Sequence, residues 1–301
     1  MLTRLKLHKM KHFLNFKNIE KQELEKLIDT TLKIENNNIE KVNSYALLKF
    51  DEGSTRTRLS FSLAAKKSGI EIVEMTDLIS AKSKGEDLQH EIETYKALGI
   101  EVLVIRTKEN NFQDYEKIDD LSVISAGFGN SSHPTQAIID VATLQKFNKL
   151  DRDIPITYVG DLKHSRVFES GRELLEKLGF KVGIYASDEL LPDDLSNLQI
   201  YNSWDEVVSN TSAIELLRVQ KERIKDIKEF NFEQYIKHFQ ISEEILDNSP
   251  DDLIVLHPMP INVGIEISEE ASLHNKFKYQ EQLHLGIGSR IAAYKFVLEL
   301  I

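Results

Sequence analysis

The segment Ser54-Thr55-Arg56-Thr57-Arg58 carries the side chains of this chain that are best suited to bind an anion. It follows an apolar run that ends at Phe50 and opens a helical pattern, so backbone N–H groups and the positive end of a helix face one point. Its hydroxyl groups and arginines add donors that suit phosphate oxygens. The alternative is a Ser/Thr helix cap beside solvated arginines. Because arginine occurs twice in this single turn, we favour the anion site.

Strands and helices that alternate along the chain must position this turn. Runs rich in Val, Ile and Leu alternate with amphipathic stretches, and Gly, Ser or Asp stands at the junctions, which is typical of βα units. Strands are expected at 45–50, 70–75, 102–105, 154–159, 182–185, 214–217 and 253–256, and helices at 58–68, 86–98, 135–147, 168–178 and 288–300. We therefore predict an α/β fold with two doubly wound parallel-sheet domains and the active site in the cleft between them.

Length and composition narrow the class of protein. At 301 residues with 41% hydrophobic content, the chain suits two domains better than one. The formal net charge of -11 argues against a general affinity for nucleic acid or anionic membranes. No apolar run approaches the length of a membrane span. The absence of cysteine excludes disulfides, thiolate metal sites and a cysteine nucleophile, and the scattered histidines show no metal-ligand spacing.

The anion-binding turn and its context resemble the carbamoyl phosphate signature of the aspartate and ornithine carbamoyltransferase family. The resemblance continues in order and nearly end to end. The segment 80–86 resembles the family's mobile loop, whose serine and second lysine, here Ser80 and Lys84, enter the active site of the neighbouring subunit. Arg106, at the end of its strand, matches the arginine that contacts both the phosphate and the carbonyl oxygen. Taken singly, these segments would read as an exposed basic loop and a surface arginine.

The segment 132–136 resembles the His-Pro-x-Gln motif of the same family. The resemblance implies that His133 donates to the carbamoyl oxygen, where negative charge develops in the transition state, and that Gln136 holds the carbamoyl amide. A histidine before proline would otherwise be a structural cap. The implied carbamoyl phosphate site comprises Ser54, Thr55, Arg56, Thr57, Ser80, Lys84, Arg106, His133, Gln136 and Pro258, of which Arg56, Thr57, Arg106 and His133 are catalytic.

Two positions depart from the family's pattern. The turn ahead of the histidine motif reads Gly127-Phe128-Gly129, where the aspartate enzymes usually carry Gly-Asp-Gly. Gly53 stands beside the anion-binding turn, where the family commonly has proline or alanine. We expect these departures to alter local hydrogen bonding and to loosen the turn, respectively.

The second half of the chain resembles the aspartate branch of the family. An aspartate site needs two cation clusters, one for each carboxylate, whereas an ornithine site needs an acid for the distal amine. The resemblance implies that Arg166 binds the α-carboxylate and that Arg218 and Gln220 bind the β-carboxylate, with Lys84 also in the aspartate site. In the segment 257–260, His-Pro-Met-Pro, the backbone carbonyl groups of Pro258 and Met259 would accept bonds from the carbamoyl amide and the attacking amine.

The resemblance implies transfer of a carbamoyl group from carbamoyl phosphate to L-aspartate, which gives N-carbamoyl-L-aspartate and phosphate in pyrimidine synthesis. No covalent nucleophile, metal or cofactor is expected, because the substrate amine attacks an already activated carbonyl group. Two alternatives stay open: ornithine or another amino acid as the acceptor, and a non-catalytic partner subunit of the same fold. Expected domains are residues 1–134 for carbamoyl phosphate, with a C-terminal helix at about 285–301 packed back on them, and residues 135–284 for aspartate.

The family also implies the assembly and the location of the protein. We expect a homotrimer with active sites shared between subunits, no nucleic acid or membrane partner, and a cytoplasmic location; whether a separate regulatory chain exists stays open. The basic opening of residues 1–17 has the charge of a targeting peptide but lacks its apolar segment.

Overall fold

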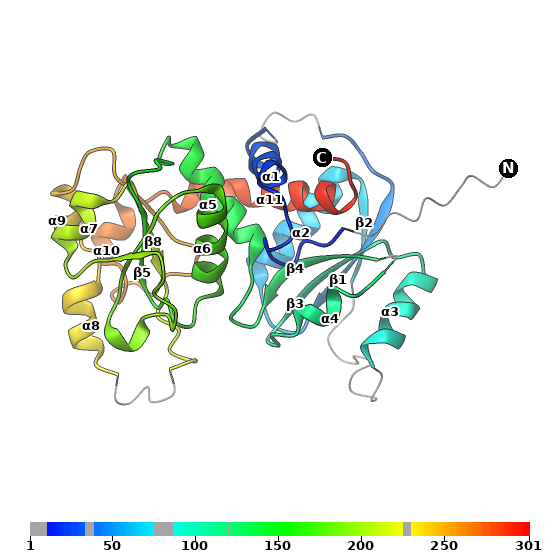
Figure 1. Ribbon diagram of the computed structural model, residues 1–301, viewed down its shortest axis with the longest axis horizontal. Coiled ribbons are helices and arrows are strands. Elements are labelled where there is room, and N and C mark those ends of the chain that lie inside the picture. The colour runs from blue at the N-terminus through cyan, green and yellow to red at the C-terminus, as the bar shows by residue number, and fades with distance from the viewer. Residues whose placement is uncertain (1–10, 34–38, 75–86, 120, 225–229) are drawn as a thin grey trace. The chain divides into compact units, whose positions relative to one another are not determined.

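The computed structural model describes residues 11–33, 39–74, 87–119, 121–224 and 230–301 (Figure 1). The chain divides into two compact units: unit 1 comprises Met1–Thr135 and Ile287–Ile301, and unit 2 comprises Gln136–Gly286. Two helices continue across this division, α5 (Pro134–Lys146) and α11 (Tyr279–Val297).

Unit 1 contains a four-stranded sheet in the order β2-β1-β3-β4. Its strands are β1 (Ser44–Phe50), β2 (Ile70–Glu74), β3 (Val102–Thr107) and β4 (Ser122–Phe128). Every pair of neighbours is parallel, so the carboxyl ends of all the strands lie at one edge. The chain first winds from β1 to β2 and then returns to the other side of β1 to form β3, so the winding direction reverses between β1 and β3.

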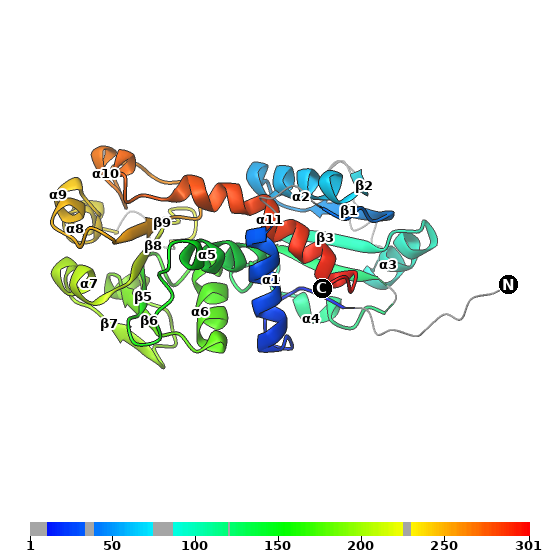
Figure 2. The same cartoon turned by 90° about the horizontal axis from the view of Figure 1, so that it is seen from above.

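Helices cover both faces of this sheet, as Figure 2 shows for α2 and α4. The helices of unit 1 are α1 (Lys21–Lys33), α2 (Thr55–Ser68), α3 (Leu88–Ala97), α4 (Phe112–Tyr115) and the second part of α11. On one face α2 packs against α11, with the Phe61 and Tyr294 rings 5.8 Å apart. On the other, Tyr95 of α3 and Tyr115 of α4 join a buried cluster with Leu103 of β3.

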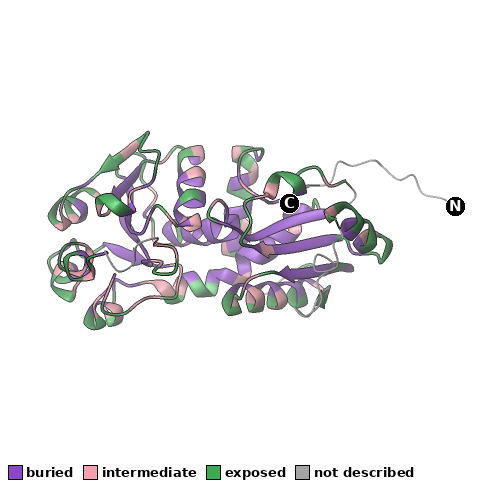
Figure 3. Ribbon diagram, turned by 90° about the horizontal axis from the view of Figure 1, so that it is seen from below, coloured by how far each residue is buried: buried purple, intermediate pink, exposed green. Residues whose placement is uncertain are grey.

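Unit 2 contains a five-stranded parallel sheet in the order β7-β6-β5-β8-β9. Its strands are β5 (Ile156–Gly160), β6 (Val182–Tyr185), β7 (Leu198–Ile200), β8 (Ala213–Leu217) and β9 (Ile254–Leu256). The winding direction again reverses beside the first strand, here between β5 and β8. Figure 3 shows that most of the strands in both units are buried, which explains their nearly unbroken apolar sequences.

The helices of unit 2 also lie on both faces of their sheet (Figure 1). They are the rest of α5, α6 (Arg166–Leu178), α7 (Trp204–Asn210), α8 (Phe232–Phe239), α9 (Glu243–Asp247), α10 (Glu269–Leu273) and the start of α11, with a short 3-10 turn at Asp188–Leu190. On one face Phe168 of α6 packs against Tyr158 of β5, with ring centroids 5.3 Å apart. The other face carries the buried cluster to which Val207 of α7, Leu246 of α9 and Ala271 of α10 contribute.

The predicted class, α/β with two parallel sheets, is confirmed. Gly69 and Gly179 end α2 and α6 in the left-handed conformation, as their positions after the helical patterns predict. Two helices begin earlier than predicted: α2 at Thr55 rather than at residue 58, and the last helix at Tyr279 rather than at residue 288. The strand β4 is not indicated by the sequence pattern. None of the described helices combines the length and the apolar character needed to cross a membrane.

Candidate active site

The candidate anion site of unit 1 lies where the winding direction of the sheet reverses. Ser54 follows β1 and precedes the first residue of α2, and Arg106 lies near the end of β3. Phe50 of β1 is paired with Arg106, and the N–H of Asp51 donates to the Arg106 carbonyl at 2.8 Å. Ligands of open parallel sheets bind beyond the carboxyl ends of the strands at such a reversal. The topology therefore brings the 54–58 turn beside Arg106.

The first turn of α2 is arranged to present donors outward. Ser54 occupies the N-cap position with extended backbone angles, φ -159° and ψ 100°, but its side chain makes no capping hydrogen bond. A serine at this position ordinarily accepts a bond from an N–H of the first turn. Thr55 and Arg56 are exposed, whereas Thr57 is buried. The hydroxyl of Ser54 and the first N–H groups of α2 are thus not committed to capping one another, which suits an anion ligand.

Arg106 is held by contacts on both sides of its guanidinium group. Its Nε lies 2.7 Å from a carboxylate oxygen of Glu52. Its Nη1 donates to the Ala126 carbonyl at 3.2 Å and is 3.5 Å from the Thr57 hydroxyl. Glu52 is not predicted as a site residue; the signal that could have found it is an acid two positions before the anion-binding turn. This geometry orients Arg106 toward Thr57.

His133 follows β4, the strand next to β3, and directly precedes α5. The turn before it is closed by hydrogen bonds between the main chains of Phe128 and Ser132, 2.9 Å and 3.2 Å long. The Ser132 hydroxyl donates to the Leu14 carbonyl, which anchors the turn to the N-terminal segment. Pro134 then starts α5 at a position where a missing N–H carries no cost. His133 is 6% exposed, so its position is fixed by packing.

Gln136 lies in the first turn of α5 and is largely buried. Its amide nitrogen donates to the carboxylate of Asp140 at 2.8 Å, which orients the amide group. The amide oxygen is therefore the atom that can accept a hydrogen bond from an N–H of a ligand. This is the property required of a residue that holds a carbamoyl amide.

The departure at Phe128 has a structural explanation. The Phe128 side chain is fully buried and packs against Tyr115 of α4, with ring centroids 5.3 Å apart. The side chain thus points into the core of unit 1. The neighbouring Gly129 has φ +42°, and its N–H donates to the Thr107 carbonyl at 2.9 Å. Phenylalanine in place of the family's aspartate therefore extends the core, and the backbone hydrogen bonds of the turn are kept.

The departure at Gly53 leads to a prediction about stability. A Cβ atom built on Gly53 meets nothing within 4 Å, and the residue is not in the left-handed region. Gly53→Ala should therefore raise the free energy of unfolding by about 0.5 kcal/mol, because it restricts the unfolded chain. Gly129→Ala is the contrasting variant, since its Cβ would lie 1.9 Å from the Asn110 side chain. Urea unfolding curves measure both; a loss of stability in Gly53→Ala comparable to that in Gly129→Ala would contradict the prediction.

The corresponding part of unit 2 also lies at its reversal, between β5 and β8. Gly160 ends β5 and is paired with Leu217 of β8; at φ +119° a Cβ on Gly160 would lie 2.4 Å from the Leu217 carbonyl oxygen. Asp161 follows, fully buried, and accepts the N–H of Gln220 at 3.0 Å. The amide nitrogen of Gln220 donates to the His164 carbonyl at 2.7 Å. These bonds hold the loops after β5 and β8 together.

The arginines predicted to bind carboxylates lie at the end of the first of these loops and at the start of the second. Arg166 is the first residue of α6, where the positive end of the helix adds to its charge, and Ser165 caps the helix by accepting the Phe168 N–H at 3.2 Å. Arg218 follows β8 and forms an ion pair with Glu222 through its terminal nitrogens. Although burial opposes ionisation of Glu222, the hydrogen bond from Arg218 helps to lower the pKa of this carboxyl. Arg218 is thus positioned to bind a carboxylate.

Pro258 and Met259 lie in the loop after β9, the strand next to β8. Met259 has φ 54°, a left-handed conformation that is uncommon for a residue other than glycine, and the Met259–Pro260 peptide bond is cis. His257, which the sequence analysis did not assign to the site, is buried directly before this turn. Ser80 and Lys84, the expected residues of the mobile loop, lie outside the described residues.

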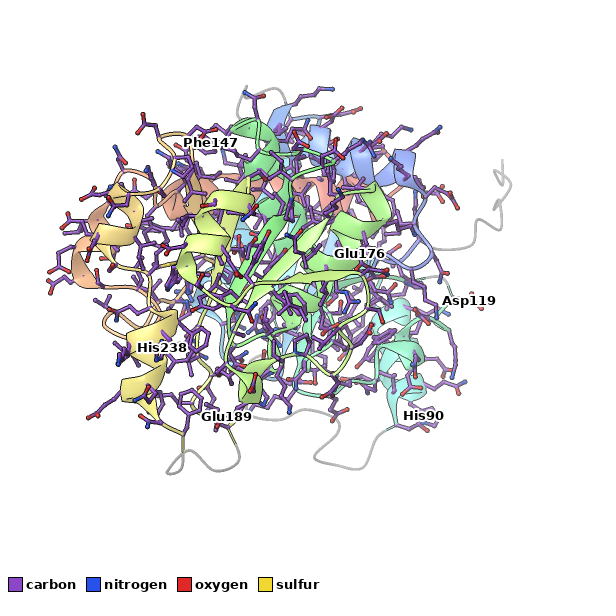
Figure 4. The ribbon with its side chains drawn as sticks, turned by 60° about the vertical axis from the view of Figure 1, so that its left-hand side comes forward. His90, Asp119, Phe147, Glu176, Glu189 and His238 are labelled. Atoms are coloured by element: carbon purple, nitrogen blue, oxygen red, sulfur yellow. The ribbon has the colours of Figure 1, made fainter. Side chains whose placement is uncertain are left out.

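Among the described residues, no group of three or more His, Asp or Glu side chains is arranged to hold a metal ion. The histidines His90 of α3 and His238 of α8, labelled in Figure 4, are both exposed.

Comparison with known proteins gives matches over nearly the whole chain. Residues 11–146 match the family model of the aspartate/ornithine carbamoyltransferase carbamoyl-P binding domain, and residues 152–296 match that of the Asp/Orn binding domain. The aspartate carbamoyltransferase catalytic subunit of Aquifex aeolicus is 32% identical over 96% of this chain and 99% of its own length.

Solved structures agree with these matches. The catalytic subunit of aspartate transcarbamoylase from M. jannaschii is 31% identical, with a TM-score of 0.82 over 96% of this chain and 98% of that one. The enzyme of Trypanosoma cruzi in complex with carbamoyl phosphate is 25% identical, with a TM-score of 0.83 over 95% of both chains.

Proposed function

The chain belongs to the aspartate/ornithine carbamoyltransferase family, and on this basis we propose that it transfers the carbamoyl group of carbamoyl phosphate to the amine of L-aspartate. The products are N-carbamoyl-L-aspartate and phosphate, in the synthesis of pyrimidines. The observation that carries the choice of aspartate is the pair of arginines, Arg166 and Arg218, on the two loops that flank the reversal in unit 2. Two cations match the two carboxylates of aspartate, whereas ornithine has one carboxylate and a cationic distal end.

The proposed reaction needs no covalent intermediate on the protein. The nitrogen of the aspartate amine forms a bond to the carbonyl carbon of carbamoyl phosphate, and the bond from that carbon to the phosphate oxygen breaks. The leaving phosphate takes the proton that the amine loses. Thr57, Arg106 and His133 stabilise the negative charge that develops on the carbonyl oxygen. The remaining catalytic contribution is orientation of the two substrates.

The proposed carbamoyl phosphate site uses both the turn after β1 and the loop after β9. Ser54, Thr55 and Arg56 bind the phosphate together with Ser80 and Lys84. The oxygen of the Gln136 amide and the Pro258 carbonyl accept from the carbamoyl amide, while the Met259 carbonyl accepts from the attacking amine. Arg166 binds the α-carboxylate of aspartate, and Arg218 and Gln220 bind its β-carboxylate, with Lys84 nearby.

We propose that residues 1–134, with the C-terminal helix at about 285–301, form the carbamoyl phosphate domain and that residues 135–284 form the aspartate domain. A cytoplasmic location is proposed from the family alone.

Phosphate release with aspartate and with ornithine, measured side by side, tests the choice of acceptor. Turnover with aspartate and none with ornithine is the expected result. Turnover with ornithine alone would refute the proposed acceptor, and no turnover with either amino acid would favour a non-catalytic partner subunit.

We propose a homotrimer in which Ser80 and Lys84 complete the site of the neighbouring subunit. A Lys84→Ala subunit and an Arg56→Ala subunit damage different parts of such a shared site, so each homotrimer should be inactive. Mixed trimers should regain part of the activity, because some sites then combine two intact halves. Phosphate release from hybrids of verified composition provides the measurement, and hybrids that stay as inactive as the parent trimers would refute sharing.

A further inference from the structure

The His257 imidazole is held in a defined orientation by the turn that it precedes. Its side chain is 0% exposed. Its Nδ1 accepts the N–H of Met259 at 2.8 Å, and its own main-chain N–H donates to the Gln282 side-chain oxygen at 2.7 Å. Because Nδ1 accepts a hydrogen bond, the proton of the neutral ring must lie on Nε2. The bond to Met259 spans Pro258, so it closes a small ring that contains the Pro258–Met259 peptide group and with it the Pro258 carbonyl of the proposed site.

The opposite side of the imidazole faces a buried acid. The Nε2 atom of His257 lies 3.6 Å from a carboxylate oxygen of Glu266, whose side chain is 1% exposed. The same oxygen accepts the main-chain N–H of Asn262. The Asn262 amide nitrogen in turn donates to the Val219 carbonyl at 3.2 Å. Glu266 is therefore linked through Asn262 to Val219, which lies between Arg218 and Gln220.

Gln282 extends this arrangement to the start of α5. While its side-chain oxygen accepts from His257, its nitrogen donates to Asp140 at 2.9 Å, and Asp140 also accepts the Gln136 amide at 2.8 Å. Burial, and then the charge of Asp140, raise the pKa of the neighbouring Glu215 well above its usual value. The main chain of His257 and the side chain of Gln136 are therefore positioned by one buried group of hydrogen bonds.

We propose that His257 is a positioning residue of the carbamoyl transfer: through the Met259 N–H it fixes the Pro258–Met259 peptide group, which sets the direction of the Pro258 carbonyl and the position of Met259, whose own carbonyl follows. Met259 needs such support because its left-handed backbone, at φ 54°, is unfavourable for a side chain with a Cβ. A carbonyl that turns away from the attacking amine loses the alignment on which the reaction rate depends. The inference rests on the proposed function, since it assigns these carbonyls to that reaction.

Two variants separate this role from simple packing. His257→Asn keeps an acceptor close to the position of Nδ1 but does not reach Glu266. His257→Gln keeps a donor that reaches toward Glu266 but loses the acceptor for the Met259 N–H. Both variants remove the ring, so we expect similar decreases in thermal stability. We expect kcat to fall about 100-fold in His257→Gln and less than about fivefold in His257→Asn, and the affinity for carbamoyl phosphate to weaken more in His257→Gln than in His257→Asn.

Steady-state kinetics with aspartate, together with thermal unfolding, distinguish the outcomes. Equal losses of kcat in the two variants, or an unchanged kcat in His257→Gln, would overturn the positioning role. An inactive wild-type protein would instead refute the proposed function. If the variants do not fold, the tautomer of His257 in the wild-type protein decides: NMR of 15N-labelled histidine should show the proton on Nε2, and a proton on Nδ1 would overturn the proposal.

Discussion

Replacing Arg106 by alanine should lower kcat/KM for carbamoyl transfer by at least about 1000-fold. We assign this side chain to both the phosphate and the developing oxyanion, so its loss weakens binding and slows the chemical step. The variant also leaves the Glu52 carboxylate, 11% exposed and 2.7 Å from Nε of Arg106, without that cation. A poorly hydrated negative charge would then lie beside a site for an anionic substrate, and repulsion would add to the lost attraction.

A second substitution, Glu52→Gln, separates these two effects. In the Arg106→Ala background it removes the charge and nearly keeps the shape, so we expect it to restore about tenfold in kcat/KM. Phosphate release by the wild type, the two single variants and the double variant completes the cycle, with unfolding midpoints as the control for folding. Equal kcat/KM in Arg106→Ala and the double variant would show that Glu52 causes no repulsion. More than a tenth of wild-type activity in Arg106→Ala would contradict the assignment of Arg106.

The parts of this molecule that could be predicted from the sequence are those encoded by contiguous residues. The five residues 54–58 contain the helix start, the hydroxyls and the arginines together, so the anion site can be read directly. Only the exact start of α2 differs: the segment is predicted to open the helix, with helical residues from 58 onward, whereas Thr55 is already the first helical residue. The glycine caps of α2 and α6 are local signals in the same sense.

What could not be predicted depends on partners that are remote in the sequence. The strand β4 contains Ser125, Ala126 and Gly127 in its middle, which gives neither an alternating nor a strongly apolar pattern. It becomes a strand because it pairs with β3 and is buried on all sides. Likewise, Gln282 meets Asp140 across 142 positions of the chain, so no local pattern indicates their hydrogen bond.

The strand order, with its reversals of winding direction, determines which local motifs become neighbours in the folded chain. A motif after a strand has no defined neighbour until the strand order is known. In unit 1 the order places the turn after β1 beside the end of β3, and in unit 2 it places the loop after β5 beside the loop after β8. In each unit, the motif residues at these points thus lie at the ends of adjacent strands.

Replacing Arg218 by alanine should raise KM for aspartate and lower kcat/KM roughly 100- to 1000-fold. Arg218 is partly buried and already pairs with a carboxylate, that of Glu222, through its terminal nitrogens. The variant lacks the Arg218 guanidinium that would bind the β-carboxylate of the substrate, while the negative charge of Glu222 remains near that position. Arg218→Lys should recover only a small part of the loss, because a single ammonium group cannot reproduce the planar pair of donors.

Lys221→Ala is the matched control for this prediction. It removes one positive charge from the same segment. Lys221 is exposed and lies over the Phe232 ring, 5.0 Å from its centroid, and we propose no substrate contact for it. Its kcat/KM should stay within about threefold of the wild type, since a solvated charge at a distance is largely screened. Aspartate saturation curves and calorimetric titration with carbamoyl phosphate separate the two substrates. Similar losses in Arg218→Ala and Lys221→Ala would mean that general electrostatic attraction, rather than a specific bond from Arg218, brings aspartate to the site.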